Sequence, residues 1–129
     1  IVATLSPGAF YYLRDKKTPP VSALRAHGIR IALATDCNPG TSPMASLLLA
    51  MNMGCVLFGL SPEEALRGVT KNAARALGIQ DRGLLRVGAR ADLALWDVTQ
   101  LEQLVTQIAM HQPVDVVVDG RSVSGNPNR

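Results

Sequence analysis

The side chain best placed for chemistry is that of Asp36, which follows the apolar run 29–34 and begins a polar loop. The run is short and apolar without clear alternation, which is typical of a buried strand in a parallel sheet. The carboxyl end of such a strand faces the ligand in α/β enzymes, so Asp36 is a candidate metal ligand or general base. The alternative is an Asx turn, in which Asp36 or Asn38 bonds its own backbone before Pro39 and Gly40. Spacing alone favours the turn.

The elements that must position Asp36 alternate between strand and helix, an order that predicts a parallel sheet. They are a strand at 1–5, a helix at Val21 to Ala26, a strand at 29–35 and a long helix at 43–59. Ser42 is expected to cap the long helix, with Pro43 in its first turn. The apolar residues of that helix occupy nearly every face, so it should be buried on most sides.

Two shorter helices should follow the long one. The sequence Ser61-Pro62-Glu63-Glu64 has the form of a capping box, which predicts that a helix begins there. Thr70 is expected to cap the next helix, Lys71 to Leu77, and Gly78 to end it in a left-handed conformation.

After Gly78 the helical spacing gives way to short strands separated by glycine and polar residues, so we expect a boundary near residue 79. It would divide the chain into units 1–78 and 79–129. The expected elements of the second unit are strands at 84–87, 91–97 and 114–118 and an amphipathic helix at 100–110. Asp119-Gly120 should form a tight turn after the last strand. Nothing in this unit suggests chemistry.

Composition narrows the class of protein. The net charge is +3, the charged fraction is 18% and the aromatic fraction is 4%, with no basic run longer than Lys16-Lys17. These values argue against nucleic acid as a partner. The apolar stretch 44–60 is too short and too interrupted to span a bilayer, so no membrane is expected. Cys37 and Cys55 match no zinc pattern and are too few for a disulfide framework, which favours the cytoplasm.

Two strings near Asp36 resemble one family. They are TDCNPGTSP at 35–43 and PGAFYYLRDKKTPPV at 7–21, and both are similar to imidazolonepropionases, amidohydrolase-superfamily enzymes of histidine breakdown. Two later strings resemble the carboxyl-terminal portion of amidohydrolases in general: SPEEALRGVTKNAARALGIQDRG at 61–83 and GLLRVGARADLALWD at 83–97. The resemblance extends to about residue 123 and is more specific in its first half.

The resemblance implies an α/β fold made of the closing strands and helices of a (β/α)8 barrel, followed by part of a small β-sandwich. A whole barrel takes about 250 residues, whereas this chain has 129. The resemblance therefore implies an incomplete barrel whose partner is the missing amino-terminal part of the enzyme. A small-molecule substrate is expected, and a homodimer is a candidate assembly.

The resemblance also assigns roles around the loop. It implies that Asp36 ligates a catalytic zinc or iron ion and takes the proton of the attacking water, two roles that suit a carboxylate. It places Asn38 and Gly40 at the substrate pocket and lets Thr41 bond the imidazolone or its propionate tail. The N–H groups that begin the helix at Pro43 would suit an anionic carboxylate.

The other metal ligands of the family are a His-x-His pair and a further histidine on earlier barrel strands. This chain has only His27 and His111. His27 is expected at a helix end on the surface, and His111 precedes Gln112-Pro113 in the second unit, so neither is expected to be a ligand. Since catalytic metal sites normally need three protein ligands, the isolated chain should hydrolyse nothing.

The implied reaction is the metal-assisted opening of 4-imidazolone-5-propanoate to N-formimidoyl-L-glutamate. A first alternative is an amidohydrolase that acts on another cyclic amide or on an amidine, which the strings after residue 61 would allow. A second alternative is a non-catalytic fragment or assembly module, which the absent histidines favour for the isolated chain.

Overall fold

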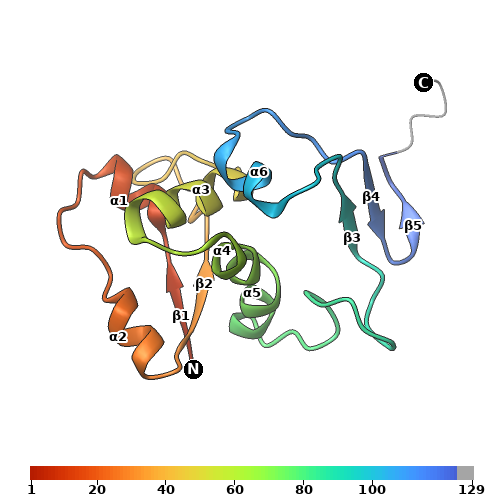
Figure 1. Ribbon diagram of the computed structural model, residues 1–129, viewed down its shortest axis with the longest axis horizontal. Coiled ribbons are helices and arrows are strands. Elements are labelled where there is room, and N and C mark those ends of the chain that lie inside the picture. Colours follow the sequence, from red (N-terminus) through yellow and green to blue (C-terminus); the bar gives the residue numbers. More distant parts are fainter. Residues whose placement is uncertain (125–129) are drawn as a thin grey trace.

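The computed structural model describes residues 1–124, so the end of the predicted second unit, 125–129, lies outside the described residues. The elements in chain order are β1 Val2–Leu5, α1 Pro7–Tyr12, α2 Val21–Ala26, β2 Arg30–Leu33, α3 Leu47–Phe58, α4 Pro62–Val69, α5 Lys71–Ala76, β3 Leu93–Leu95, α6 Leu101–Thr106, β4 Asp115–Val118 and β5 Arg121–Ser122. Figure 1 shows the helices gathered around β1 and β2, with β3, β4 and β5 forming a second sheet beside them.

The first sheet consists of β1 and β2, which run parallel with Val2 opposite Arg30 and Leu5 opposite Leu33. A further backbone bond, from the Ala34 N–H to the Leu5 carbonyl (3.0 Å), extends the pairing past the end of β2. Both strands point toward the same end of the molecule in Figure 1, where the loop after β2 begins. The two strands predicted at 1–5 and 29–35 are confirmed, with β2 shorter than expected.

The main core lies between β2 and the helices that pack on it. Its buried members are apolar side chains from both sheet and helices: Val21, Ile31, Leu33, Met51, Leu60, Ala65 and Val105. Ile31, Ala32 and Leu33 are all buried, so β2 is covered on both faces, as the continuous apolar run indicated. The strand that leads to Asp36 is therefore enclosed in the core.

The long helix begins later than its sequence indicated. Ser42 does not cap it; α3 begins at Leu47, and Ser46 is the cap, with its Oγ accepting from the Leu49 N–H at 3.2 Å. Pro43 consequently lies in the connection before the helix. Ser42 and Ser46 both have a side chain suited to an N-cap. Ser42 does not serve as the cap because its backbone pairs with Asn38.

The capping box at the start of α4 is confirmed. Ser61 Oγ accepts from the Glu64 N–H (3.2 Å), and the Glu64 carboxylate accepts from the Ser61 N–H (2.8 Å). The same carboxylate accepts two bonds from Arg25 of α2, and Arg25 also donates to the Gly59 carbonyl. The Arg25 guanidinium lowers the pKa of Glu64 from its ordinary value. This ion pair ties α2 to the turn between α3 and α4.

The helix predicted at Lys71 to Leu77 is present as α5, but the Thr70 side chain does not cap it. Thr70 Oγ1 donates instead to the Leu66 carbonyl of α4 at 2.7 Å. Gly78 adopts the expected left-handed conformation after the helix, with φ 73°. Helix α1 was not predicted, although Ser6-Pro7 repeats the Ser-Pro signature of Ser61-Pro62.

The second sheet is antiparallel in the order β3-β4-β5. The strands predicted at 91–97 and 114–118 are present in shortened form, and the turn at Asp119-Gly120 is confirmed, with φ of 51° and 77°. The strand predicted at 84–87 is wrong: this segment contains bends, and Leu85 and Val87 are exposed. Among residues 1–124 no segment pairs with it, and an unpaired apolar run is not a strand.

Helix α6 is shorter than the predicted 100–110 and packs on the first half of the chain. Its Leu104 and Val105 are buried, and Asn52 of α3 donates from Nδ2 to the Val105 carbonyl at 2.8 Å. The boundary near residue 79 stays a prediction. No helix formed by the described residues is both long enough and apolar enough to cross a membrane.

Candidate functional site

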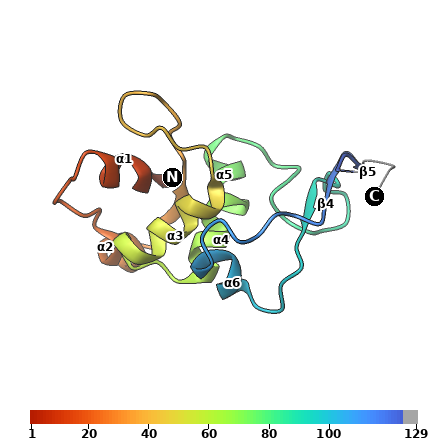
Figure 2. The same ribbon diagram turned by 90° about the horizontal axis from the view of Figure 1, so that it is seen from above.

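The loop between β2 and α3 carries every residue that the sequence singled out for chemistry. Figure 2 shows this loop, in orange to yellow, projecting from the body of the molecule beyond α1 and α3. Asp36 is exposed near the start of the loop and has a left-handed backbone, with φ 49°. No group in residues 1–124 donates a hydrogen bond to its carboxylate. Both carboxylate oxygens are therefore open to a cation or a proton donor from outside this segment.

The Asx-turn alternative belongs to Asn38 rather than to Asp36. Asn38 Oδ1 accepts from the Gly40 N–H (3.0 Å), the Thr41 N–H (2.8 Å) and the Thr41 hydroxyl (3.1 Å). Its Nδ2 donates to the Asp36 carbonyl at 2.6 Å. Asn38 thus organises the loop with most of its amide, and one N–H remains for a ligand.

Gly40 and Thr41 lie beside Asn38, so the structure brings three predicted substrate-binding residues together. The Thr41 hydroxyl gives its proton to Asn38, which leaves oxygen lone pairs to accept a bond from a ligand N–H. A Cβ built on Gly40 would approach nothing closer than Asn38 Oδ1 at 3.5 Å. Local packing therefore does not require glycine there, and the exposed side of Gly40 is open to a close approach from outside.

Ser42 is a residue of this loop whose role the sequence did not reveal. It is 1% exposed, and its hydroxyl donates to the Thr35 carbonyl at 2.6 Å. Its backbone pairs with Asn38 in both directions, at 3.0 and 3.3 Å. A serine directly before a proline is typical of a helix start, so the sequence predicted a helix cap at Ser42 and not a role inside the loop.

The expected anion site at the helix start is not where the sequence placed it. Because α3 begins at Leu47, the free N–H groups are not at Pro43, and the Leu49 N–H is already bonded to Ser46 Oγ. No helix therefore begins directly after Thr41 whose N–H groups could bind the carboxylate tail of a substrate.

The described residues contain no group of three or more His, Cys, Asp or Glu side chains that could hold a metal ion. His27 is the exposed C-cap residue that follows α2, and His111 is hydrogen bonded to Gln107 beyond the carboxyl end of α6. Asp36 fits a divalent ion as one hard oxygen ligand, and the remaining ligands would have to come from outside this segment.

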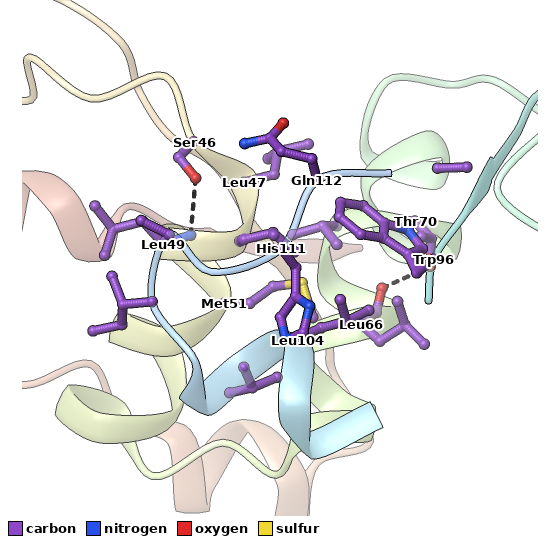
Figure 3. A pocket seen from close by; sticks show the side chains of 16 residues that line it. Ser46, Leu47, Leu49, Met51, Leu66, Thr70, Trp96, Leu104, His111 and Gln112 are labelled. Carbon is purple, nitrogen blue, oxygen red and sulfur yellow. Dashed lines mark hydrogen bonds between the residues drawn. The ribbon is translucent and has the colours of Figure 1, made fainter. Parts of the chain in front are cut away.

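A hollow in the described part of the chain reaches Ser46 at the end of this loop but is not lined by Asp36, Asn38, Gly40 or Thr41. It has a volume of about 620 Å³ and is lined mainly by apolar side chains of α3, α4, α6 and β3. Figure 3 shows Met51, Leu66, Leu104, Trp96 and His111 among the side chains that line it. Its lining contains no carboxylate, so we place the candidate site at the Asp36 loop and not in this hollow.

Comparison with known sequences gives one family and a set of close relatives. The sequence model of the amidohydrolase family matches residues 5–124. An imidazolonepropionase from Alteromonas mediterranea is 59% identical over 122 residues, which cover 95% of this chain and 29% of the relative. This chain therefore spans less than a third of the length of that relative.

Solved structures agree on the fold. A guanine deaminase from E. coli superposes with a TM-score of 0.73 at 19% identity, over 95% of this chain and 33% of the deaminase. An adenosine deaminase from Xanthomonas campestris, solved with bound zinc, gives a TM-score of 0.70 at 26% identity over 92% of this chain and 31% of that chain. The elements described above are thus part of a larger barrel enzyme fold, and the expectation of an incomplete barrel is confirmed.

Proposed function

Because the chain belongs to the amidohydrolase family, we propose that it is the carboxyl-terminal, aspartate-bearing portion of an imidazolonepropionase. The whole enzyme would open the cyclic amide of 4-imidazolone-5-propanoate by hydrolysis to give N-formimidoyl-L-glutamate. One observation carries the proposal: the open carboxylate of Asp36 lies past the carboxyl end of β2, in a segment 59% identical to an imidazolonepropionase.

Asp36 performs the proton transfer in this proposal. Its carboxylate accepts no hydrogen bond from residues 1–124, so it can accept the proton of the water that attacks the ring carbonyl, and then return it to the leaving nitrogen. Asp36 would also be one of the ligands of a zinc or iron ion, which supplies Lewis acidity when bound. The other ligands belong to the amino-terminal part of the enzyme.

The neighbouring residues hold the substrate. The remaining N–H of Asn38 Nδ2 donates to an oxygen of the imidazolone or its propionate, and the Thr41 oxygen accepts from a ring N–H. Gly40 lets the ring lie against the backbone. A donor and an acceptor on one side of the ring match a cyclic amide, which presents both a carbonyl and an N–H.

A second candidate is a deaminase-like amidohydrolase, because the solved neighbours include guanine and adenosine deaminases. Those neighbours are 19% and 26% identical to this chain, against 59% for the imidazolonepropionase, so the latter is favoured. An assembly role without catalysis stays an alternative for the segment alone. The homodimer and the cytoplasmic location expected from the sequence also stay predictions.

A substrate comparison tests the proposal. The full-length enzyme that contains this segment is loaded with zinc or iron and assayed on imidazolone propionate, adenosine and guanine in parallel. We expect kcat/KM for imidazolone propionate to exceed the other two by at least about 10⁴, since a site that pairs polar groups strongly rejects a substrate that leaves them unpaired. Equal or greater turnover of a purine would replace this proposal by the deaminase reading.

We also expect Thr41→Val to weaken substrate binding without slowing the chemical step. The change keeps the shape but removes the oxygen that accepts from the ring, together with its own bond to Asn38. Asn38 Oδ1 keeps its two backbone donors, Gly40 N–H and Thr41 N–H, so the loop should hold its shape. The lost ligand bond is of about 1 kcal/mol, so KM should rise several-fold with kcat little changed. Steady-state kinetics measures both constants. Thr106→Val is the matched control, because Thr106 Oγ1 donates to the Glu102 carbonyl of α6 and bonds no other group in residues 1–124. A fall in kcat for Thr41→Val would show that Thr41 acts in the transition state instead.

A further inference from the structure

The backbone of Asp36 is held in an unfavourable conformation from both sides. Its φ of 49° lies in the left-handed region, which residues with a Cβ rarely occupy, although Asp and Asn tolerate it better than the others. The orientations of the two peptide groups that flank its Cα define φ and ψ, and both groups are tethered through their carbonyls. Ser42 Oγ donates to the Thr35 carbonyl and Asn38 Nδ2 donates to the Asp36 carbonyl, each at 2.6 Å. Strain of this kind persists only where the surrounding structure fixes it.

The Ser42 hydroxyl is itself fixed by its surroundings. Ser42 is 1% exposed. Its N–H donates to the Asn38 carbonyl, and its own carbonyl accepts from the N–H groups of Asn38 and Met44, at 3.0 and 2.7 Å. Since the backbone on each side of the hydroxyl is bonded, the hydroxyl cannot follow the Thr35 carbonyl if the latter moves. It acts as an anchor for the peptide group that precedes Asp36.

Gly8 provides the space in which that anchor lies. Gly8 is buried in the first turn of α1, directly after β1. A Cβ built on it would lie 2.6 Å from Ser42 Oγ and 2.8 Å from Met44 Cε, closer than such atoms can approach. The absence of a side chain at Gly8 therefore lets the end of β1 and the loop after β2 meet at the Ser42 hydroxyl.

We propose that Ser42, packed against Gly8, is a positioning residue for the hydrolysis. Its hydroxyl holds the Thr35 peptide group, which holds Asp36 in the left-handed conformation and thereby directs the Asp36 carboxylate toward the reacting water. This inference rests on the proposed function, because Ser42 acts only through Asp36. Groups that orient a catalytic residue in this way typically change activity by about 10- to 100-fold when removed.

The test is a double-mutant cycle in the full-length enzyme. Ser42→Ala should lower kcat by about 10- to 100-fold with little change in KM. In an Asp36→Asn background the same substitution should lower kcat hardly any further, because the carboxylate that Ser42 positions is gone. A merely structural role for Ser42 would give an equal loss in both backgrounds.

Ser46→Ala is the matched control. It also removes a serine hydroxyl bonded to the backbone, here to the Leu49 N–H, but at the cap of α3 and with no bond to either peptide group that flanks Asp36. It should lower the unfolding temperature and leave kcat unchanged. If Ser42→Ala fails to fold, Ser42→Cys replaces the hydroxyl by a slightly larger thiol that is only a weak donor, and it should also lower kcat.

The possible failures are distinguishable. Parental kcat in folded Ser42→Ala or Ser42→Cys, or an equal loss in the parental and Asp36→Asn backgrounds, overturns the positioning role and leaves the proposed function intact. Undiminished turnover in the Asp36→Asn single variant overturns the proposed function, and the positioning role with it.

Discussion

Asp36→Asn in the full-length enzyme should lower kcat for imidazolone propionate by at least about 10² to 10⁴, the loss typical of a removed general base. Asparagine keeps the size of the side chain and one acceptor oxygen. It also tolerates the left-handed backbone at φ 49°, so the loop should keep its shape. What disappears is the negative charge that, in the proposed function, accepts the proton and binds the cation. Steady-state kinetics with metal analysis of the same sample separates loss of the base from loss of the ion.

The matched control is Asp119→Asn. Asp119 is also a left-handed aspartate, with φ 51°, but it lies in the turn before β5 with its carboxylate 3.3 Å from Arg90 Nε. The same chemical change there should leave kcat within a few-fold, because an exposed ion pair contributes little. If Asp36→Asn turned over substrate as fast as Asp119→Asn, Asp36 would be a turn residue and its assignment as base and ligand would be wrong.

The local signals in the sequence were reliable where one physical cause decided the outcome. The apolar run before Asp36 predicted a buried strand, because a strand covered on both faces has no reason to alternate. The capping box at Ser61 was read correctly, since both of its hydrogen bonds form within four residues. The position of Asp36 at the end of its strand followed from these local rules.

The local sequence patterns gave wrong predictions where contacts between distant residues decide which of two local structures forms. Ser42 and Ser46 both suit a helix cap, and the choice depends on the backbone pairing of Ser42 with Asn38 and on the Gly8 contact across the chain. Residues 84–87 have the composition of a strand but form none, because strand formation depends on a partner. The bonds of Asn38 to its own loop were foreseen only as one form of an Asx turn.

The loop geometry leads to a second large effect, at Asn38. Asn38→Ala removes the bond to the Asp36 carbonyl together with the three bonds that Oδ1 accepts from Gly40 and Thr41. The Asp36 carbonyl then has no bond to Asn38, and the backbone at Gly40 and Thr41 loses the bonds that fix its conformation. Since a displacement of about 1 Å in a catalytic group can cost about 10²-fold, we expect kcat to fall by at least that factor. KM should rise as well, because Thr41 loses its position.

Asn72→Ala is the control for Asn38→Ala. Asn72 Nδ2 also donates to a backbone carbonyl, that of Ile31 in β2, at 2.8 Å. Its loss should reduce the free energy of unfolding by about 1 kcal/mol and leave kcat within a few-fold of the parent, because it supports the strand and not the loop. A different pattern for Asn38→Ala, with KM raised and kcat unchanged, would mean that Asn38 acts on the substrate and that its bonds within the loop do not affect kcat. The tether on the Asp36 carbonyl would then be irrelevant to the chemical step, since catalysis would proceed equally well without it.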